Sequence, residues 1–366
     1  VSRDWSSDVC SSDLFDYLCL DSILNAQHPE SAKRGRLAHE EVLFIITHQT
    51  FELWFKQILF ELESIQELFA KTPLTEKDLY TIVSRLRRVV GIQKLINQQF
   101  NILESMTPLD FLDFRDALTP ASGFQSVQFR EIELRLGLSH DLKPVNFGRF
   151  SESDRCHLHQ IAEQKSLFEL VDAWFQRMPF LKFGDFDFWR TYRKAVGNML
   201  LQDERTIRNN SLLDESEKIH QLHELKNTRH AFDCLFDAKL YLEQQQKGRF
   251  RLSQTSTLAA LFVHLYRDET MLQLPFDLLT NLMDIDEQLT VWRNGHALMV
   301  HRMVGTKIGT GGSSGHEYLK STIGRQRIFA DIFNLSTFLI PRSLLPSLPK
   351  AITGTLRFQV SEDPGQ

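Results

Sequence analysis

A long apolar stripe over residues 40–69 constrains the fold of this chain more than any other feature. Apolar side chains recur there at alternating spacings of four and three residues, which places them on one face of an α-helix. One polar side chain, that of His48, shares their register. The members of this stripe are Phe44, His48, Phe51, Phe55, Ile58, Leu62, Ile65 and Phe69. We therefore predict one long helix whose apolar face lies in a core.

A second stripe of the same kind runs from residue 282 to residue 303. Its members are Leu282, Ile285, Leu289, Trp292, His296, Met299 and Met303, with His296 as the one polar member. Further helices are predicted over residues 76–105, 110–118, 160–178, 186–207, 214–246 and 323–334. Strand-type alternation is scarce. The sequence therefore predicts an all-α fold.

The composition favours a well-ordered globular protein. Of the 366 residues, 42% are apolar and 24% are charged, and Gly and Pro are few. We expect one helical domain over residues 15–350, with an inserted helical subdomain over residues 131–251. Residues 1–14 are rich in Ser and Asp and lack helical periodicity, so we expect a foreign or disordered tail there. Residues 351–366 are expected to form a loose C-terminal tail.

Charge and hydropathy argue against two classes of partner. The formal net charge is -5, which gives no attraction to nucleic acid or to anionic lipid. No apolar run approaches the roughly 20 residues that a membrane-spanning helix needs. The four cysteines show no CxxC pairing, which is typical of a reducing compartment. We expect a cytoplasmic protein that binds neither nucleic acid nor a membrane.

His48 and His296 are the candidate metal-binding or catalytic side chains. An imidazole on an apolar face needs a hydrogen-bond partner or a metal, and for either residue alone a satisfied core histidine is an adequate explanation. His301 lies five residues after His296, which turns it off the stripe, so these two do not form a metal pair. The segment Cys156-His-Leu-His159 lacks a second ligand pair at zinc-type spacing, and we attribute it to chance.

Two further features suggest a small-molecule site. Arg115 lies four residues after Phe111, and a guanidinium beside an aromatic ring suits the capture of a carboxylate. An ordinary salt bridge to Asp113 or Asp116 is the alternative. Residues 305–315 are dense in glycine but match neither the phosphate-binding nor the dinucleotide-binding pattern. A lid over a bound molecule and a plain linker both remain open.

Four segments together resemble the tryptophan 2,3-dioxygenase family. They occur in family order and with family-like spacing, and the resemblance covers about residues 17–346. The segments are Phe44-Ile-Ile-Thr-His48-Gln-Thr-Phe-Glu-Leu-Trp54, Asp110-Phe-Leu-Asp-Phe-Arg115 followed by Ser122-Gly123, Met283-Asp-Ile-Asp286 with Trp292-Arg-Asn-Gly-His296, and Gly309-Thr-Gly-Gly-Ser-Ser-Gly315. The fold that this resemblance implies is a helical haem-dioxygenase bundle.

The resemblance also implies a reaction and a role for each site residue. The reaction is cleavage of the indole C2-C3 bond of L-tryptophan by O2, which gives N-formyl-L-kynurenine and opens the kynurenine route of tryptophan catabolism. It implies one haem b per subunit, with His296 as the proximal iron ligand. His48 would hydrogen-bond the indole N–H as the catalytic residue. The substrate-binding residues would be Phe44, Phe111, Arg115, Ser122, Gly123 and Thr310.

The resemblance further implies a homotetramer, a dimer of dimers in which Tyr17 and Leu18 line the substrate pocket of a neighbouring subunit. One departure concerns Leu14, which stands where the family usually has tyrosine. Two other hypotheses about the function remain open. A haem protein of another kind, such as an oxygen carrier or a peroxide-using enzyme, would explain both histidines but not Arg115. A non-catalytic helical scaffold would explain neither histidine.

Overall fold

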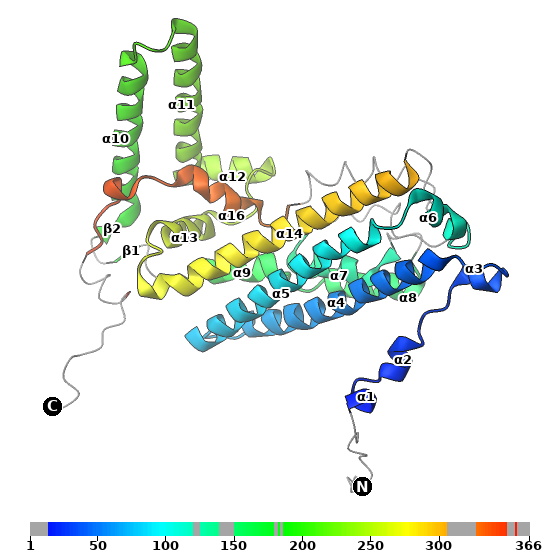
Figure 1. The fold of residues 1–366 in the computed structure, drawn as a ribbon. Coiled ribbons are helices and arrows are strands. Elements are labelled where there is room, and N and C mark those ends of the chain that lie inside the picture. The colour runs from blue at the N-terminus through cyan, green and yellow to red at the C-terminus, as the bar shows by residue number, and fades with distance from the viewer. Residues whose placement is uncertain are drawn as a thin grey trace, which may run out of the picture. The chain divides into compact units, whose positions relative to one another are not determined.

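The computed structural model describes residues 14–119, 125–138, 150–178, 182–183, 186–305, 327–349 and 356. Helices dominate these residues, as Figure 1 shows, and the predicted all-α class is confirmed. The strands within the described ranges are β1 (Lys182–Phe183) and β2 (Phe186–Asp187), which pair in an antiparallel ribbon of two residues each. This ribbon was not predicted, because strands of two residues carry no readable alternation.

The α-helices follow one another along the chain in this order. They are α1 (Leu14–Tyr17), α2 (Leu20–Leu24), α3 (Glu30–Lys33), α4 (His39–Phe69), α5 (Glu76–Leu103), α6 (Pro108–Arg115), α7 (Val127–Leu136), α8 (Glu152–Ala162), α9 (Leu167–Phe175), α10 (Phe188–Asn209), α11 (Glu215–Phe236), α12 (Ala238–Gln246), α13 (Gln254–Leu265), α14 (Gln273–Val304) and α16 (Ala330–Asn334). Short 3-10 turns cover Thr270–Leu272, Leu335–Phe338 and Arg342–Leu344.

Helix α4 is the predicted first long helix. The stripe from Phe51 to Phe69 is buried, and Leu62 and Ile65 are fully inaccessible. Glu40 and Glu41 lie in its first turn, where negative charge complements the helix dipole. The helix therefore forms where the apolar periodicity predicted it.

Helix α14 carries the second stripe but begins nine residues before the predicted start at residue 282. Pro275 lies in its first turn, where a proline costs little because the amide groups of that turn have no partner within the helix. The helix ends at Val304, and Gly305 follows with a φ of +60°. Its amide donates to the carbonyl of His301 at 2.8 Å, so Gly305 closes the helix as a left-handed cap.

The middle of the chain is more broken than predicted. The helix predicted over residues 160–178 is divided into α8 and α9, and Ser166 caps the start of α9. The helix predicted over 214–246 is broken at Asp237, whose carboxylate accepts from the first amides of α12. The helix predicted over 323–334 begins only at Ala330, and residues 323–326 lie outside the described ranges. In the first two cases a local capping contact overrides the average propensity.

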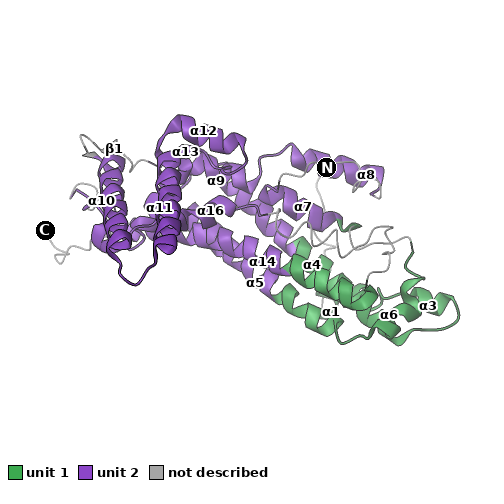
Figure 2. Ribbon diagram, turned by 90° about the horizontal axis from the view of Figure 1, so that it is seen from above, with its two compact units in different colours: residues 1–56, 95–126, 292–323 green, residues 57–94, 127–291, 324–366 purple. Residues whose placement is uncertain are grey.

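Two compact units make up the chain, coloured separately in Figure 2. The first contains residues 1–56, 95–126 and 292–323, and the second contains residues 57–94, 127–291 and 324–366. The predicted subdomain over 131–251 falls within the second unit. The single domain over 15–350 stays a prediction, as do both tails, of which the structure describes only residues 14 and 356.

Among the described residues, no helix combines the length and the apolar character that a membrane crossing requires.

Candidate active site

Five of the predicted site residues lie on the stretches of α4, α6 and α14 that belong to the first unit. Phe44 and His48 lie on α4, Phe111 and Arg115 on α6, and His296 on α14. Three others, Ser122, Gly123 and Thr310, lie outside the described residues. Tyr17 ends α1 and Leu18 follows it.

The imidazole of His48 is held by its own helix. Its Nδ1 lies 2.7 Å from the carbonyl oxygen of Phe44, one turn earlier. Because a carbonyl only accepts, Nδ1 carries the proton and Nε2 is left as a lone-pair acceptor. Burial lowers the pKa of His48 below its ordinary value, and the Phe44 carbonyl and Glu52 only partly oppose this. The ring is therefore neutral at neutral pH.

Aromatic rings surround His48 on the side of α6. The Phe44 ring lies 4.0 Å from the His48 ring, 6.1 Å from that of Phe111 and 5.5 Å from that of Phe114, between centroids. Phe111 and Phe114 meet edge to face at 5.4 Å. Phe114, almost fully buried, was missed by the sequence analysis, although it lies within the quoted motif and one turn after Phe111. These rings form a wall suited to a flat apolar group.

A second set of rings connects His48 with His296. Phe51 lies edge to face with His48 at 5.9 Å and contacts Phe100 at 5.7 Å. Phe100 in turn stacks on His296 at 6.5 Å with an interplanar angle of 16°. The ring centroid of Trp292 lies 4.8 Å from that of Phe51 and 4.7 Å from that of Phe100. The two stripe histidines therefore share one aromatic cluster, which the sequence alone did not show.

Gly295 permits the close approach of Phe100 to α14. A Cβ atom at this position would lie 3.1 Å from Cδ2 of Phe100, tighter than ordinary van der Waals contact. A glycine inside a helix costs roughly 1 kcal/mol relative to alanine, so it needs a packing reason. A glycine inside the predicted helix, directly before His296, could therefore have indicated from the sequence that another side chain packs closely there.

Arg115 occupies the last turn of α6, where its positive charge complements the helix dipole. The helix starts at a capping box: the amide of Asp110 donates to the Thr107 hydroxyl at 3.3 Å, and the amide of Thr107 donates to the Asp110 carboxylate at 3.1 Å. Pro108 takes the first helical position. Arg115 is half-buried, while Asp113 and Asp116 are exposed.

The N-terminal segment of the described chain exposes apolar side chains. Tyr17 is 73% and Leu18 is 42% exposed, and Leu14, Phe15, Ile23 and Leu24 are also exposed. Such a run of apolar surface on two short helices is typical of a segment that packs against another molecule.

The donor set fits a haem better than a bare metal ion. No three His, Cys, Asp or Glu side chains converge as metal ligands anywhere in the described ranges. His301 is exposed and off the stripe, and His157 binds Glu131 through Nε2 at 2.8 Å. A bare zinc ion needs three or four protein ligands, whereas a porphyrin supplies four of its own and needs one axial imidazole. His296, half-buried beside Phe100 and Trp292, offers an imidazole in such an apolar setting.

Comparison with known proteins agrees with this chemistry. The profile described as tryptophan 2,3-dioxygenase matches residues 6–339. A tryptophan 2,3-dioxygenase of Alteromonas mediterranea is 48% identical over 348 residues, which is 94% of this chain and 96% of that protein. Those of Dictyostelium discoideum and Mus musculus are 46% and 44% identical over 93% and 91% of this chain, covering 87% and 83% of their own lengths.

Proposed function

Since the chain belongs to the tryptophan 2,3-dioxygenase family, we propose that it cleaves the indole C2-C3 bond of L-tryptophan with O2 to give N-formyl-L-kynurenine. The observation that carries this proposal is the aromatic cluster shared by His48 and His296. It joins a neutral acceptor imidazole to a second imidazole on an apolar face, inside the segment that matches the family.

In this proposal, His296 would hold the iron of one haem b per subunit. When bound, the haem iron supplies the oxygen chemistry, and the protein supplies orientation and a dry pocket. Phe100 limits the rotation of the His296 ring by stacking on it. Gly295 allows that stacking, so the residue before the ligand serves to position it.

His48 positions the indole ring. Its Nε2 lone pair accepts a hydrogen bond from the indole N–H, because Nδ1 already donates to the Phe44 carbonyl. The lowered pKa keeps the acceptor unprotonated at neutral pH. This assignment requires no proton transfer to His48.

The remaining contacts hold the amino acid part of the substrate and its ring. The Arg115 guanidinium forms a bidentate contact with the substrate carboxylate, and Phe44 and Phe111 line the ring. By family resemblance, Ser122, Gly123 and Thr310 complete the substrate site.

The assembly and compartment follow the family pattern in this proposal. The chain forms a homotetramer in which Tyr17 and Leu18 contact the substrate pocket of a neighbour, which would cover the apolar side chains that α1 and α2 expose. We place the enzyme in the cytoplasm. The unpaired thiols of Cys19, Cys156 and Cys234 are compatible with a reducing compartment.

Aerobic incubation of the ferrous, haem-loaded protein with L-tryptophan under 18O2 tests the proposal. We expect N-formylkynurenine carrying two labelled oxygen atoms, measured by mass spectrometry. His296→Ala should lose the haem Soret band, whereas His301→Ala, on the same helix but exposed, should keep it. Haem binding without product would indicate an oxygen carrier instead, and a normal Soret band in His296→Ala would refute the ligand assignment.

A further inference from the structure

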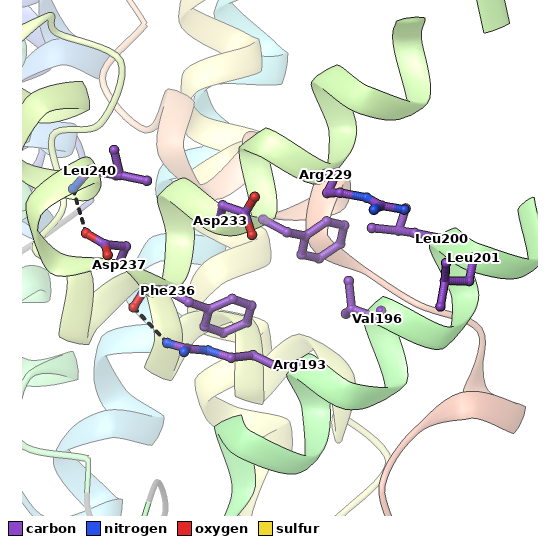
Figure 3. A pocket seen from close by; sticks show the side chains of 11 residues that line it. Arg193, Val196, Leu200, Leu201, Arg229, Asp233, Phe236, Asp237 and Leu240 are labelled. Carbon is purple, nitrogen blue, oxygen red and sulfur yellow. Dashed lines mark hydrogen bonds between the residues drawn. The ribbon is translucent and has the colours of Figure 1, made fainter. Parts of the chain in front are cut away.

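A cavity of about 620 Å³ opens between α10, α11 and the start of α12 in the second unit (Figure 3). Facing positions on the two antiparallel helices α10 and α11 supply most of its lining. The lining residues are Arg193, Val196, Gly197, Leu200, Leu201, Arg229, Phe232, Asp233, Phe236, Asp237 and Leu240. This volume lies within the range of about 300–1,000 Å³ that is typical of small-molecule sites.

The floor of the cavity is apolar. Val196 and Leu200 on α10 and Phe232 on α11 are buried. Phe236, one turn after Phe232 on α11, also lines the cavity. Gly197 adds space, because a Cβ atom at this position would meet no other atom within 4 Å. The room beside these side chains is suited to the ring of an organic molecule.

Arg193 brings a positive charge to one end of this floor. One of its terminal nitrogens donates to the carbonyl of Phe236 at 2.7 Å, and its guanidinium lies 4.6 Å from the centre of the Phe236 ring. Within the described ranges, no carboxylate forms an ion pair with Arg193. A guanidinium has five N–H donors, so this fixed cation keeps donors for a ligand.

The other charged side chains of the cavity are arranged differently. A terminal nitrogen of Arg229 forms an ion pair with the carboxylate of Glu204 at 3.6 Å. Asp237 is already used, since it accepts the amides of Lys239 and Leu240 at the start of α12. The carboxylate of Asp233 has no hydrogen-bond partner in the part of the chain that the structure describes. The cavity thus offers an available cation at Arg193 and an available anion at Asp233.

We propose that this cavity binds a small aromatic monocarboxylate, with the ring on Val196, Leu200 and Phe232 and the carboxylate on Arg193. Arg193 is itself exposed to solvent, so what it adds for a monocarboxylate is charge attraction and N–H donors, whereas a polyanion would be repelled by the exposed Asp233 and Asp237. Asp233 also favours ligands that carry an ammonium group beside the carboxylate. The site shares no residue with the candidate active site, and its existence does not rest on the proposed function.

Titration of the full-length, haem-loaded protein with 3-phenylpropionate by calorimetry tests this site. The experiment uses an Arg115→Ala background to suppress binding at the candidate active site. Two variants alter the cavity: Gly197→Leu fills it from a position with room for a side chain, and Arg193→Gln removes the charge but retains a donor for Phe236. The matched controls are Gly91→Leu, another helix glycine with open space, and Arg190→Gln, an exposed arginine of α10 outside the lining.

We expect saturable binding of one molecule per chain that both cavity variants weaken by about tenfold or more and both controls leave intact. L-phenylalanine should bind more tightly than 3-phenylpropionate, and Asp233→Asn should remove that advantage. Absence of saturable binding, or equal binding in Gly197→Leu and the parent, would overturn the proposal. Binding of 2-phenylethylamine in preference to 3-phenylpropionate would overturn the role of the carboxylate.

Discussion

The chemistry of His48 is set by the carbonyl of Phe44. A histidine near the surface of a helix could present either ring nitrogen, but this contact fixes the proton on Nδ1 and leaves Nε2 as an acceptor. The tautomer of His48 therefore depends on a contact within α4 and needs no hydrogen-bond partner from another helix. Burial adds the neutral charge state, which is a tertiary effect.

Arg115 provides a prediction about substrate binding. Arg115→Ala should raise the KM for L-tryptophan roughly tenfold to a hundredfold, because a charge-assisted contact contributes about 1.5–3 kcal/mol. Haem content should stay near that of the parent. Steady-state kinetics check this, with Arg302→Ala as a control at an exposed arginine in the same unit. An unchanged KM in Arg115→Ala would contradict its role as the carboxylate ligand.

Because His264 is buried, we predict that the free energy of unfolding falls in mild acid. Burial, with a smaller contribution from the Arg267 charge, lowers its pKa to about 4, and its Nε2 has no hydrogen-bond partner among the described residues. Between pH 6.5 and about 4 the unfolded chain therefore binds more protons at this ring than the folded chain does. The stabilisation is complete above pH 6.5 and is lost as the pH falls toward 4.

The size of this effect is at most about 3 kcal/mol, and less to the extent that water reaches the ring. The free energy of unfolding, measured by urea denaturation at several pH values, should fall over this range. His264→Phe should flatten the dependence, although His48 contributes in the same direction. A slope equal to that of the parent would show that His264 is not the group responsible.

At the scale of the element, the start of α6 connects stability with the site. Thr107→Ala removes the cap of the helix that carries Phe111 and Arg115 and should cost about 1 kcal/mol of unfolding free energy. Thr75→Ala removes the equivalent cap of α5, where the Asp78 amide donates to the Thr75 hydroxyl at 3.1 Å. No predicted site residue lies in that first turn.

We expect a similar loss of stability in both cap variants but a higher KM for L-tryptophan only in Thr107→Ala. Thermal denaturation and steady-state kinetics separate the two effects. An equal rise of KM in both variants would mean that general loosening, and not the position of Arg115, controls substrate binding.

At the scale of the whole molecule, the exposed apolar side chains of α1 and α2 predict a contribution from one subunit to another. Deleting residues 1–14 should leave folding intact. Deleting residues 1–18 also removes Tyr17 and Leu18 and should strongly reduce activity while haem is retained.

Complementation between subunits tests this contact. A chain lacking residues 1–18 keeps its own pocket, and an Arg115→Ala chain keeps its N-terminal segment. Co-expression of the two should restore part of the activity in mixed tetramers, measured as N-formylkynurenine formed per haem. No recovery in assemblies verified to be mixed would show that the segment acts only within its own chain.

Local sequence was sufficient for the two long helices and for several of their ends. The three-and-four spacing from Phe44 to Phe69 needs no distant partner, since one buried face stabilises the helix whatever covers it. Motifs within single segments also identified His48, Arg115 and His296 as the residues of interest. The same local rules missed the start of α14 and the break at Asp237, because a tolerated proline and a capping carboxylate decide those points.

Only the tertiary structure decided which faces meet. Phe100 lies on α5 and was not recognised from the sequence, yet it stacks on His296 and contacts Phe51 beside His48. The cavity between α10 and α11 likewise has no sequence signature, because two amphipathic helices can pack with or without a gap. Periodicity indicates that one face of a helix is buried. It does not indicate which element covers that face, because the hydrophobic effect is not directional. The choice of partner depends on how distant side chains fit together.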